Sequence, residues 1–190
     1  MMRPGGVLVV LFLIAIVPPS PARAAEPTTT DPCALVESTD IGAILGYPVE
    51  VADATSRTAG ICFFTSRAIS QDGSVTYAFV TADNLAQRRS FAAAQARRCA
   101  GVAKNAPNAL ACASYADVAN ATDLDAYFKA RTSSPDAVPV PSLGTSAVAA
   151  PNALYVRTPE RILEVVVRRE ERLDIERETT LARLLLERSK

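Results

Sequence analysis

Three aspartates, Asp117, Asp123 and Asp125, are the residues of this chain whose spacing best suits a catalytic or metal-binding site. Paired carboxylates can carry out hydrolysis when the two carboxyl groups lie about 5–10 Å apart in a cleft. With Asn120, the same segment offers oxygen ligands for calcium, but it lacks the ordered spacing and central glycine of a helix–loop–helix calcium site. Acidic residues near a helix start usually cap the helix. We therefore expect a structural role and assign no catalytic residue, metal ligand or cofactor.

The chain contains no histidine and no tryptophan, and its two methionines are its first two residues. A serine or cysteine nucleophile therefore has no histidine base, and histidine ligands for zinc, copper and haem are missing. The remaining chemistry belongs to carboxylate, lysine, tyrosine and arginine side chains, and none has a spacing that specifies a mechanism. Composition thus excludes large classes of enzymes without naming a reaction.

The cysteines form an even set of four, Cys33, Cys62, Cys99 and Cys112. In an exported chain, an even number of cysteines predicts disulfide bonds. Three connectivities are open, and we favour Cys33 with Cys62 and Cys99 with Cys112 because these pairs close the shortest loops. A metal–thiolate site is the alternative, but C-x-x-C spacing is absent and an oxidising compartment disfavours free thiolates.

The start of the chain has the features of a cleaved secretory signal. Arg3 precedes an apolar run from Val7 to Val17, and Ala22-Arg23-Ala24 supplies small residues for cleavage before Ala25. The run is shorter than the roughly 20 apolar residues that span a membrane, and no cysteine beside it could carry a lipid. We therefore predict a signal peptide over 1–24 and a soluble product, secreted, periplasmic or in the cell envelope, without a membrane anchor.

Charge gives no sign of a nucleic-acid or membrane partner. The chain has 20 basic and 20 acidic residues, and loss of Arg3 and Arg23 with the signal leaves 18 against 20. A balance of this kind provides no electrostatic footprint for nucleic acid or anionic lipid. The length that remains suits one domain with a real core. We expect a disordered leader over 25–31 and a single disulfide-bonded domain over 32–190, with a linker-like segment at about 132–142.

Hydrophobic periodicity and turn residues predict the order of the elements. Gly46 is placed to end the first helix, Asp83 to cap a long second helix, and Thr122 with Asp125 to form a capping box. The order predicts an α+β domain of two layers, an antiparallel sheet of about six strands with helices on one face and two similar halves. The expected helices cover 38–45, a long segment after Asp83, 123–131 and 174–188, and the expected strands cover 49–54, 60–66, 74–81, 146–150, 154–158 and 162–168.

Two rows of polar side chains are assigned to solvent. The arginines of the long helix point round its surface rather than forming one stripe, and we interpret them as a solvated face. In the last strand, polar and apolar residues alternate, and we interpret its outer row as a solvated face, with a binding face as the alternative. The helix arginines are Arg88, Arg89, Arg97 and Arg98, and the outer strand row is Glu164, Val166 and Arg168.

Short motifs at both ends of the predicted domain resemble a family of unknown function that is common among actinobacterial envelope lipoproteins. The motifs are Asp31-Pro32-Cys33-Ala34-Leu35, Asp40-Ile41, Leu45-Gly46, Cys62-Phe63-Phe64, Ser142-Leu143-Gly144 with Ala147, Leu154-Tyr155-Val156-Arg157 and Leu181-Ala182. The resemblance implies a two-layer domain with helices on an antiparallel sheet and a bridge between Cys33 and Cys62. This chain departs from the family because its signal lacks a lipidation cysteine and Thr145-Ser146 stand where acidic residues often follow the glycine.

Because the family has no known function, the resemblance transfers no activity. From the compartment and the fold class we expect an exported binding or interaction module of the cell envelope, whose partner is an envelope protein or a small ligand. A sheet covered by helices on one face leaves the other face free for such a partner. The alternatives from other classes are a secreted carboxylate-dependent hydrolase and a calcium-binding accessory protein.

Overall fold

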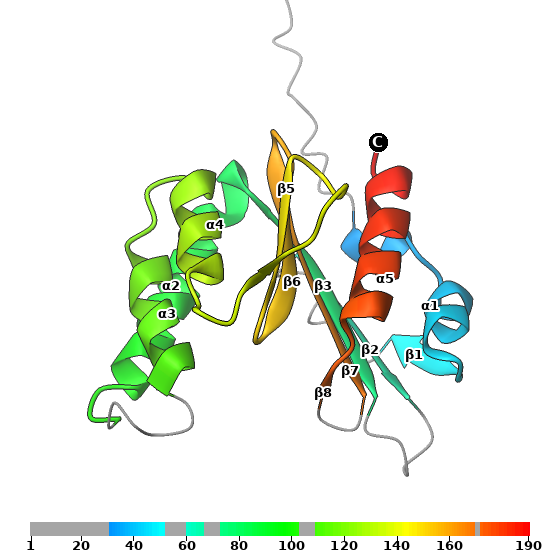
Figure 1. Cartoon of the computed structure of the whole chain (residues 1–190), viewed down its shortest axis with the longest axis horizontal. Helices are drawn as coiled ribbons and strands as arrows, with labels where there is room; N and C mark the ends of the chain where they lie inside the picture. The colour runs from blue at the N-terminus through cyan, green and yellow to red at the C-terminus, as the bar shows by residue number, and fades with distance from the viewer. Residues whose placement is uncertain (1–30, 52–59, 67–72, 103–108, 170–171) are drawn as a thin grey trace, which may run out of the picture.

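The computed structural model describes residues 31–51, 60–66, 73–102, 109–169 and 172–190. The predicted signal and the predicted leader up to residue 30 lie outside these ranges. An antiparallel sheet of eight strands runs through the middle of the structure in the order β1-β2-β3-β7-β6-β5-β4, and β8 pairs with the end of β7 (Figure 1). The strands are β1 Val49–Val51, β2 Ile61–Ser66, β3 Ser74–Thr81, β4 Val138–Pro139, β5 Ser146–Ala150, β6 Ala153–Arg157, β7 Arg161–Arg169 and β8 Arg172–Leu173.

Helices cover both faces of this sheet (Figure 1). The 3₁₀ helix η1, α1 and α5 lie on one face, and α2, α3 and α4 lie on the other. The α+β class and the antiparallel sheet are therefore confirmed, whereas the expectation of two layers with one open face is wrong. The helices are η1 Pro32–Ala34, α1 Ser38–Leu45, α2 Ala82–Arg98, α3 Ala109–Ala119, α4 Leu124–Thr132 and α5 Ile175–Arg188.

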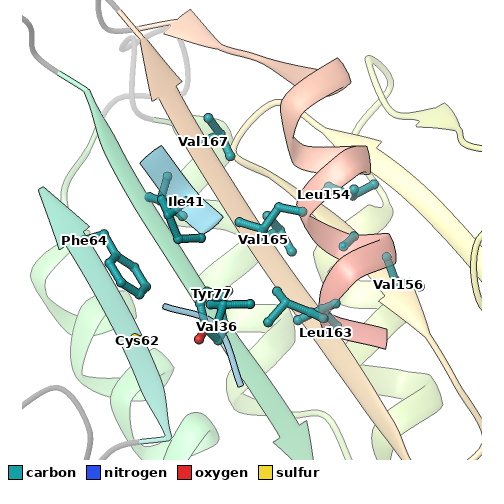
Figure 2. Close-up of a cluster of buried hydrophobic side chains, with 14 of the residues drawn as sticks. Val36, Ile41, Cys62, Phe64, Tyr77, Leu154, Val156, Leu163, Val165 and Val167 are labelled. Atoms are coloured by element: carbon teal, nitrogen blue, oxygen red, sulfur yellow. The ribbon is translucent and has the colours of Figure 1, made fainter. Parts of the chain in front are cut away.

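The larger core lies between the sheet and α1 and α5. Alternate residues of β2, β3, β7 and β6 point into it, as the period of a strand requires, and Figure 2 shows Phe64, Tyr77, Val165 and Leu154 side by side on these strands. The Tyr77 hydroxyl donates a buried hydrogen bond of 2.6 Å to the carbonyl oxygen of Pro32. This bond joins η1 to the middle of the sheet.

The smaller core lies on the opposite face, beneath α2 and α4. Ile162 and Tyr155 come from the central strands, and Leu85, Ala92 and Tyr127 come from the helices. In the outer row of β7, Glu164 and Val166 therefore face helices instead of solvent, whereas Arg168 is exposed as expected. The sequence-based interpretation failed here because Glu164 was expected to be exposed on account of its charge, although other charged residues neutralise it inside the protein.

The helices begin and end close to the residues that the sequence predicts, but the N-caps of two helices differ from the predicted ones. Gly46 ends α1 in the left-handed conformation, with φ of 83°, as predicted. The cap of α2 is Thr81 rather than Asp83, because Asn84 completes a capping box with it. The N-cap of α4 is Asp123, whose side chain accepts a hydrogen bond from the backbone N–H of Ala126 at 2.8 Å. The predicted capping box of Thr122 with Asp125 therefore places the cap one residue too early.

Helix α3 and the strand β4 lie where the sequence predicted irregular chain. The α3 sequence is rich in alanine and small residues, so it carries almost no amphipathic period from which a helix could be recognised. Strand β4 is two residues long and pairs with β5 inside the segment predicted as a linker, 132–142. Its Pro139 suits the edge of a sheet.

The two halves share a strand order but are not duplicates. Strands β1-β2-β3 and β5-β6-β7 run inward from opposite edges and meet where β3 pairs with β7. The helix after β3 lies on one face, whereas the helix after β7 lies on the other. From one half to the other, three things are reversed: the direction of the strands, their order across the sheet, and the face that the following helix covers. No rotation reverses all three at once, so a rotation cannot superpose the two halves.

Two disulfides link elements that are separate in the fold. Cys33 pairs with Cys62, joining η1 to β2 with Cα atoms 5.2 Å apart. Cys99 pairs with Cys112, joining the end of α2 to α3 with Cα atoms 5.5 Å apart. This is the nearest-neighbour connectivity, and disulfides of this kind indicate an oxidising, extracellular environment.

Candidate functional site

A buried group of charged and aromatic side chains lies between the sheet and helices α2 and α4, and we call it the arginine cluster. Glu164, in the middle of β7, is at its centre. The Tyr127 hydroxyl donates to Glu164 Oε1 at 2.9 Å. Arg131 Nε lies 3.5 Å from the same oxygen, and Arg88 Nη1 lies 3.9 Å from Oε2. The cluster consists of Arg88, Tyr127, Arg131, Tyr155 and Glu164.

The charged side chains of the cluster are largely shielded from water. Exposed fractions are 14% for the Arg88 side chain, 17% for Arg131 and 13% for Glu164. The expectations that Arg88 and Glu164 lie on solvated faces are therefore wrong. Burial of charges is costly unless they are paired, so these contacts are part of what holds α2 and α4 on the sheet.

Tyr155 forms the floor of the cluster. The Arg131 guanidinium lies over its ring, 5.1 Å from the ring centre, in a cation–π contact. Asn152 Nδ2 donates to the Tyr155 hydroxyl at 2.8 Å. Burial raises the pKa of Tyr155 and also that of Tyr127, where the negative charge of Glu164 adds to the increase. Both phenols are therefore neutral hydrogen-bonding groups.

Helix and strand periods bring these residues together. Tyr127 and Arg131 are four residues apart on α4 and share one face. Arg88 falls between Leu85 and Ala92, the two buried residues of α2, so it lies beside the buried stripe of that helix. This spacing was the one signal in the sequence that could have shown Arg88 to be inward-facing, and the charge of the side chain outweighed it.

The arginine cluster has more positive than negative charge and more donors than acceptors. Two guanidinium groups face one carboxylate. Among the residues that the structure describes, Arg88 Nε and Nη2 are buried and have no hydrogen-bond partner, and the same holds for Arg131 Nε. A buried charged donor without an acceptor costs about 1–3 kcal/mol or more. Native proteins rarely leave such groups open without a bound water, an ion or a functional reason.

The acidic residues singled out by their spacing do not form a site. Asp123 caps α4, and the hydrogen bond from the Ala126 backbone lowers the pKa of its carboxyl. Asp125 is paired with Arg157 at 2.8 Å and is mostly exposed. Asp117 is exposed on α3, and the Asn120 side-chain amide donates to the carbonyl oxygen of Ala116. Within the described part of the chain, no group of three or more acidic or cysteine residues could hold a metal ion.

A second buried carboxylate lies on the other face of the sheet. Glu178 of α5 is fully buried, and its Oε1 accepts from the backbone N–H of Val167 at 3.0 Å. Its Oε2 has no partner among the described residues. Burial raises the pKa of Glu178 to about 7, and the nearby Asp174 adds to the increase.

A shallow hollow of about 420 Å³ lies between α1 and β1. It is lined by Ser38, Thr39 and the segment from Gly46 to Val49 with Gly42, and its surface is mainly apolar. Among the described residues, no charged side chain lines it. The hollow therefore offers shape but little chemistry, and the arginine cluster is the stronger candidate site.

No family model matches this chain, and no curated protein or solved structure matches it either. The resemblance to envelope lipoproteins of unknown function stays a prediction. None of the described helices is long and apolar enough to cross a membrane.

Proposed function

We propose that this chain is an exported, disulfide-bonded binding module of the cell envelope, and that it binds a ligand at the arginine cluster. The observation that carries the proposal is the imbalance at this cluster, where two buried guanidinium groups share one carboxylate and keep donors without acceptors. A ligand that supplied acceptors would complete the cluster. Perturbed, buried polar groups of this kind are more common at functional sites than elsewhere.

Two further features support the envelope location. Both cysteine pairs form disulfides, which persist in oxidising compartments outside the cytoplasm. The first residues of the chain have the charge, apolar run and small residues of a secretory signal. The sequence resemblance to envelope lipoproteins points to the same compartment.

Binding is favoured over carboxylate-dependent hydrolysis by the partners of the carboxylates. Glu164 is held by Tyr127 and by two arginines, an arrangement that fixes its position and neutralises its charge. Asp123 and Asp125 serve a helix cap and a surface ion pair. Hydrolysis by two carboxylates needs a second group that can exchange a proton or attack the substrate, and these contacts do not supply it.

The proposal is tested by screening small molecules against the exported, oxidised protein labelled with ¹⁵N. Ligands that bind at the proposed site should shift the backbone amide signals of residues 88, 131 and 164 in a saturable way. The same screen on Arg88→Gln, which removes the guanidinium whose donors lack acceptors, should lose or weaken those shifts. Ligand-induced shifts confined to Gly42 and Gly46 would instead move the binding site to the hollow between α1 and β1, and a protein retained in the cytoplasm would contradict the envelope location.

A further inference from the structure

Building on the proposed binding site, we infer that the arginine cluster recognises the carboxylate group of a small organic acid, held by the Nε–Nη2 edge of Arg88. The inference concerns the class of ligand, and it rests on the directions of the donors, the charge of the cluster and the fixed positions of the neighbouring side chains.

The first argument is the direction of the Arg88 donors. A guanidinium has two edges that can each present a pair of parallel N–H groups. Arg88 turns Nη1 toward Glu164 at 3.9 Å. Nε and Nη2, which share the other edge, have no acceptor within the described structure. Two parallel N–H donors match the two oxygens of a carboxylate or a phosphate, and this bidentate contact is the geometry for which arginine is selected.

The second argument is charge. Two guanidinium groups and one carboxylate leave one positive charge uncompensated, because the buried phenols of Tyr127 and Tyr155 are neutral. One ligand carboxylate would neutralise the cluster. A phosphate dianion would leave a net negative charge in a shielded site, next to Glu164, and an uncompensated buried charge is costly. The charge balance therefore favours a singly charged group over a phosphate dianion, and a carboxylate is the simplest singly charged group that presents two oxygens to the donor pair.

The third argument is that, among the described residues of the cluster, Arg88 keeps a whole pair of donors unused while its neighbours are held in place. Tyr127 holds Glu164 through a hydrogen bond of 2.9 Å, and Arg131 is stacked on Tyr155. These side chains are fixed in advance, which lowers the entropy cost of binding. Arg88 keeps 14% of its side chain exposed, whereas Nε and Nη2 are buried, so the Arg88 side chain must rotate for a ligand to meet this edge.

The surroundings suggest which acid to use as a probe. Phe91 follows Arg88 by three residues on α2, and 59% of its surface is exposed. Residues three apart are neighbours on a helix surface, so an aromatic ring attached to the carboxylate can pack on Phe91 at the rim. Benzoate is therefore a better probe than acetate.

The inference is tested by titrating the exported, oxidised protein with sodium benzoate, benzamide and sodium phosphate at constant ionic strength, followed by ¹H–¹⁵N NMR. Benzoate should shift the amides of residues 88, 131 and 164 with saturation, and benzamide should bind at least tenfold more weakly. Phosphate separates a carboxylate site from a general anion site, because equal or tighter binding of phosphate would overturn the choice of carboxylate.

Two variants assign the effect to the guanidinium edge. Arg88→Lys keeps the charge but loses the parallel donors, and it should weaken benzoate binding at least tenfold. Arg98→Lys, at the exposed end of the same helix, is the matched control and should leave binding unchanged. Unaltered benzoate affinity in Arg88→Lys would overturn the inference. The backbone spectrum of each variant shows directly whether it is folded.

The outcomes also separate this inference from the proposed function. Equal binding of benzoate and benzamide at residues 88, 131 and 164 would keep the binding site but reject carboxylate recognition. Absence of any shift with benzoate would reject the inference, while the wider ligand screen would still decide whether the cluster binds anything.

Discussion

The backbone N–H of Val167 donates to the side chain of Glu178 at 3.0 Å, on the side of β7 that faces away from β3, at a point where no strand pairs with that side. Strand β6 pairs with β7 only as far as Val165, and β8 begins its pairing at Arg168. The carboxyl group of Glu178 therefore accepts the hydrogen bond that a neighbouring strand would otherwise accept from Val167. The carbonyl oxygen of Val167 accepts a hydrogen bond from the backbone N–H of Asp174. A buried acid is retained here because it satisfies a buried backbone donor.

Glu178 should make stability depend on pH. Its pKa is raised from 4.5 to about 7 in the folded protein, because burial outweighs the Val167 hydrogen bond and the charge of Arg168, while Asp174 adds to the increase. The protonated form is therefore favoured by folding. Its stabilisation is complete below pH 4.5 and is lost as pH rises to about 7, a change of about 3 kcal/mol for a shift of this size.

The measurement is urea unfolding of the wild type and Glu178→Gln between pH 4.5 and 8. The difference in unfolding free energy between the two proteins should change across this range, with the variant gaining relative to the wild type as pH rises. Glu176→Gln, an exposed position on the same helix, is the control and should give a difference that is constant with pH. A flat difference for Glu178→Gln as well would contradict the assignment.

Tyr127→Phe should destabilise the protein, because it removes the hydroxyl that donates to Glu164. Loss of a hydrogen bond to a charged group costs about 1.5–3 kcal/mol. Tyr115→Phe provides the control, since Tyr115 packs against the same core and, within the described part of the chain, its hydroxyl makes no hydrogen bond to Glu164. Chemical denaturation of both variants should show a clear loss for Tyr127→Phe and a change below about 0.5 kcal/mol for Tyr115→Phe. Equal losses would mean that the hydroxyl contributes little.

Asp123→Ala should act as the loss of a helix cap. Removal of an N-cap side chain costs about 1 kcal/mol, whereas Asp125→Ala removes only an exposed partner of Arg157 and should cost less. Neither effect should depend on calcium or chelator, which we would follow by thermal unfolding. A melting temperature that rises with calcium and loses this response in Asp123→Ala would instead establish a cation site, because a ligand of the native state stabilises by mass action.

The two disulfides should contribute unequally. Cys33 and Cys62 are 29 residues apart and Cys99 and Cys112 are 13 apart. The chain-entropy description gives each bridge about 2–4 kcal/mol, with roughly 0.7 kcal/mol more for the longer loop. Replacing each pair by alanines and measuring unfolding should rank them in this order. A larger loss for the Cys99–Cys112 pair would show that native contacts of the α2–α3 junction outweigh loop length.

The strands and most helices were predictable because their signals are local. Gly46 ends α1, and the alternation of Leu163, Val165 and Val167 follows one buried face of β7. Helix α3 escaped detection because small residues on all sides give no period. The second helical layer escaped because sequence patterns assign charged residues to solvent.

The candidate site was hidden for a related reason. Arg88 and Glu164 lie on elements that are far apart in the sequence, and only the pairing of the sheet brings their charges together. Nothing local distinguishes an arginine that meets a carboxylate inside the protein from one that meets water. The spacing of Arg88 between two buried residues was informative, but it needed a partner that the sequence could not locate.

The pairing of β3 with β7 also governs when this protein can fold. Thr81 pairs with Arg161 and Ser74 with Arg168, so the two halves of the sheet join only through contacts between distant parts of the chain. Contacts of this kind make folding slow, because a long loop must close first. Until residues 161–169 arrive, β3 presents an unpaired edge, which is the feature of a sheet most prone to association with other chains. Folding of this sheet therefore competes with aggregation for as long as β7 has not paired with β3.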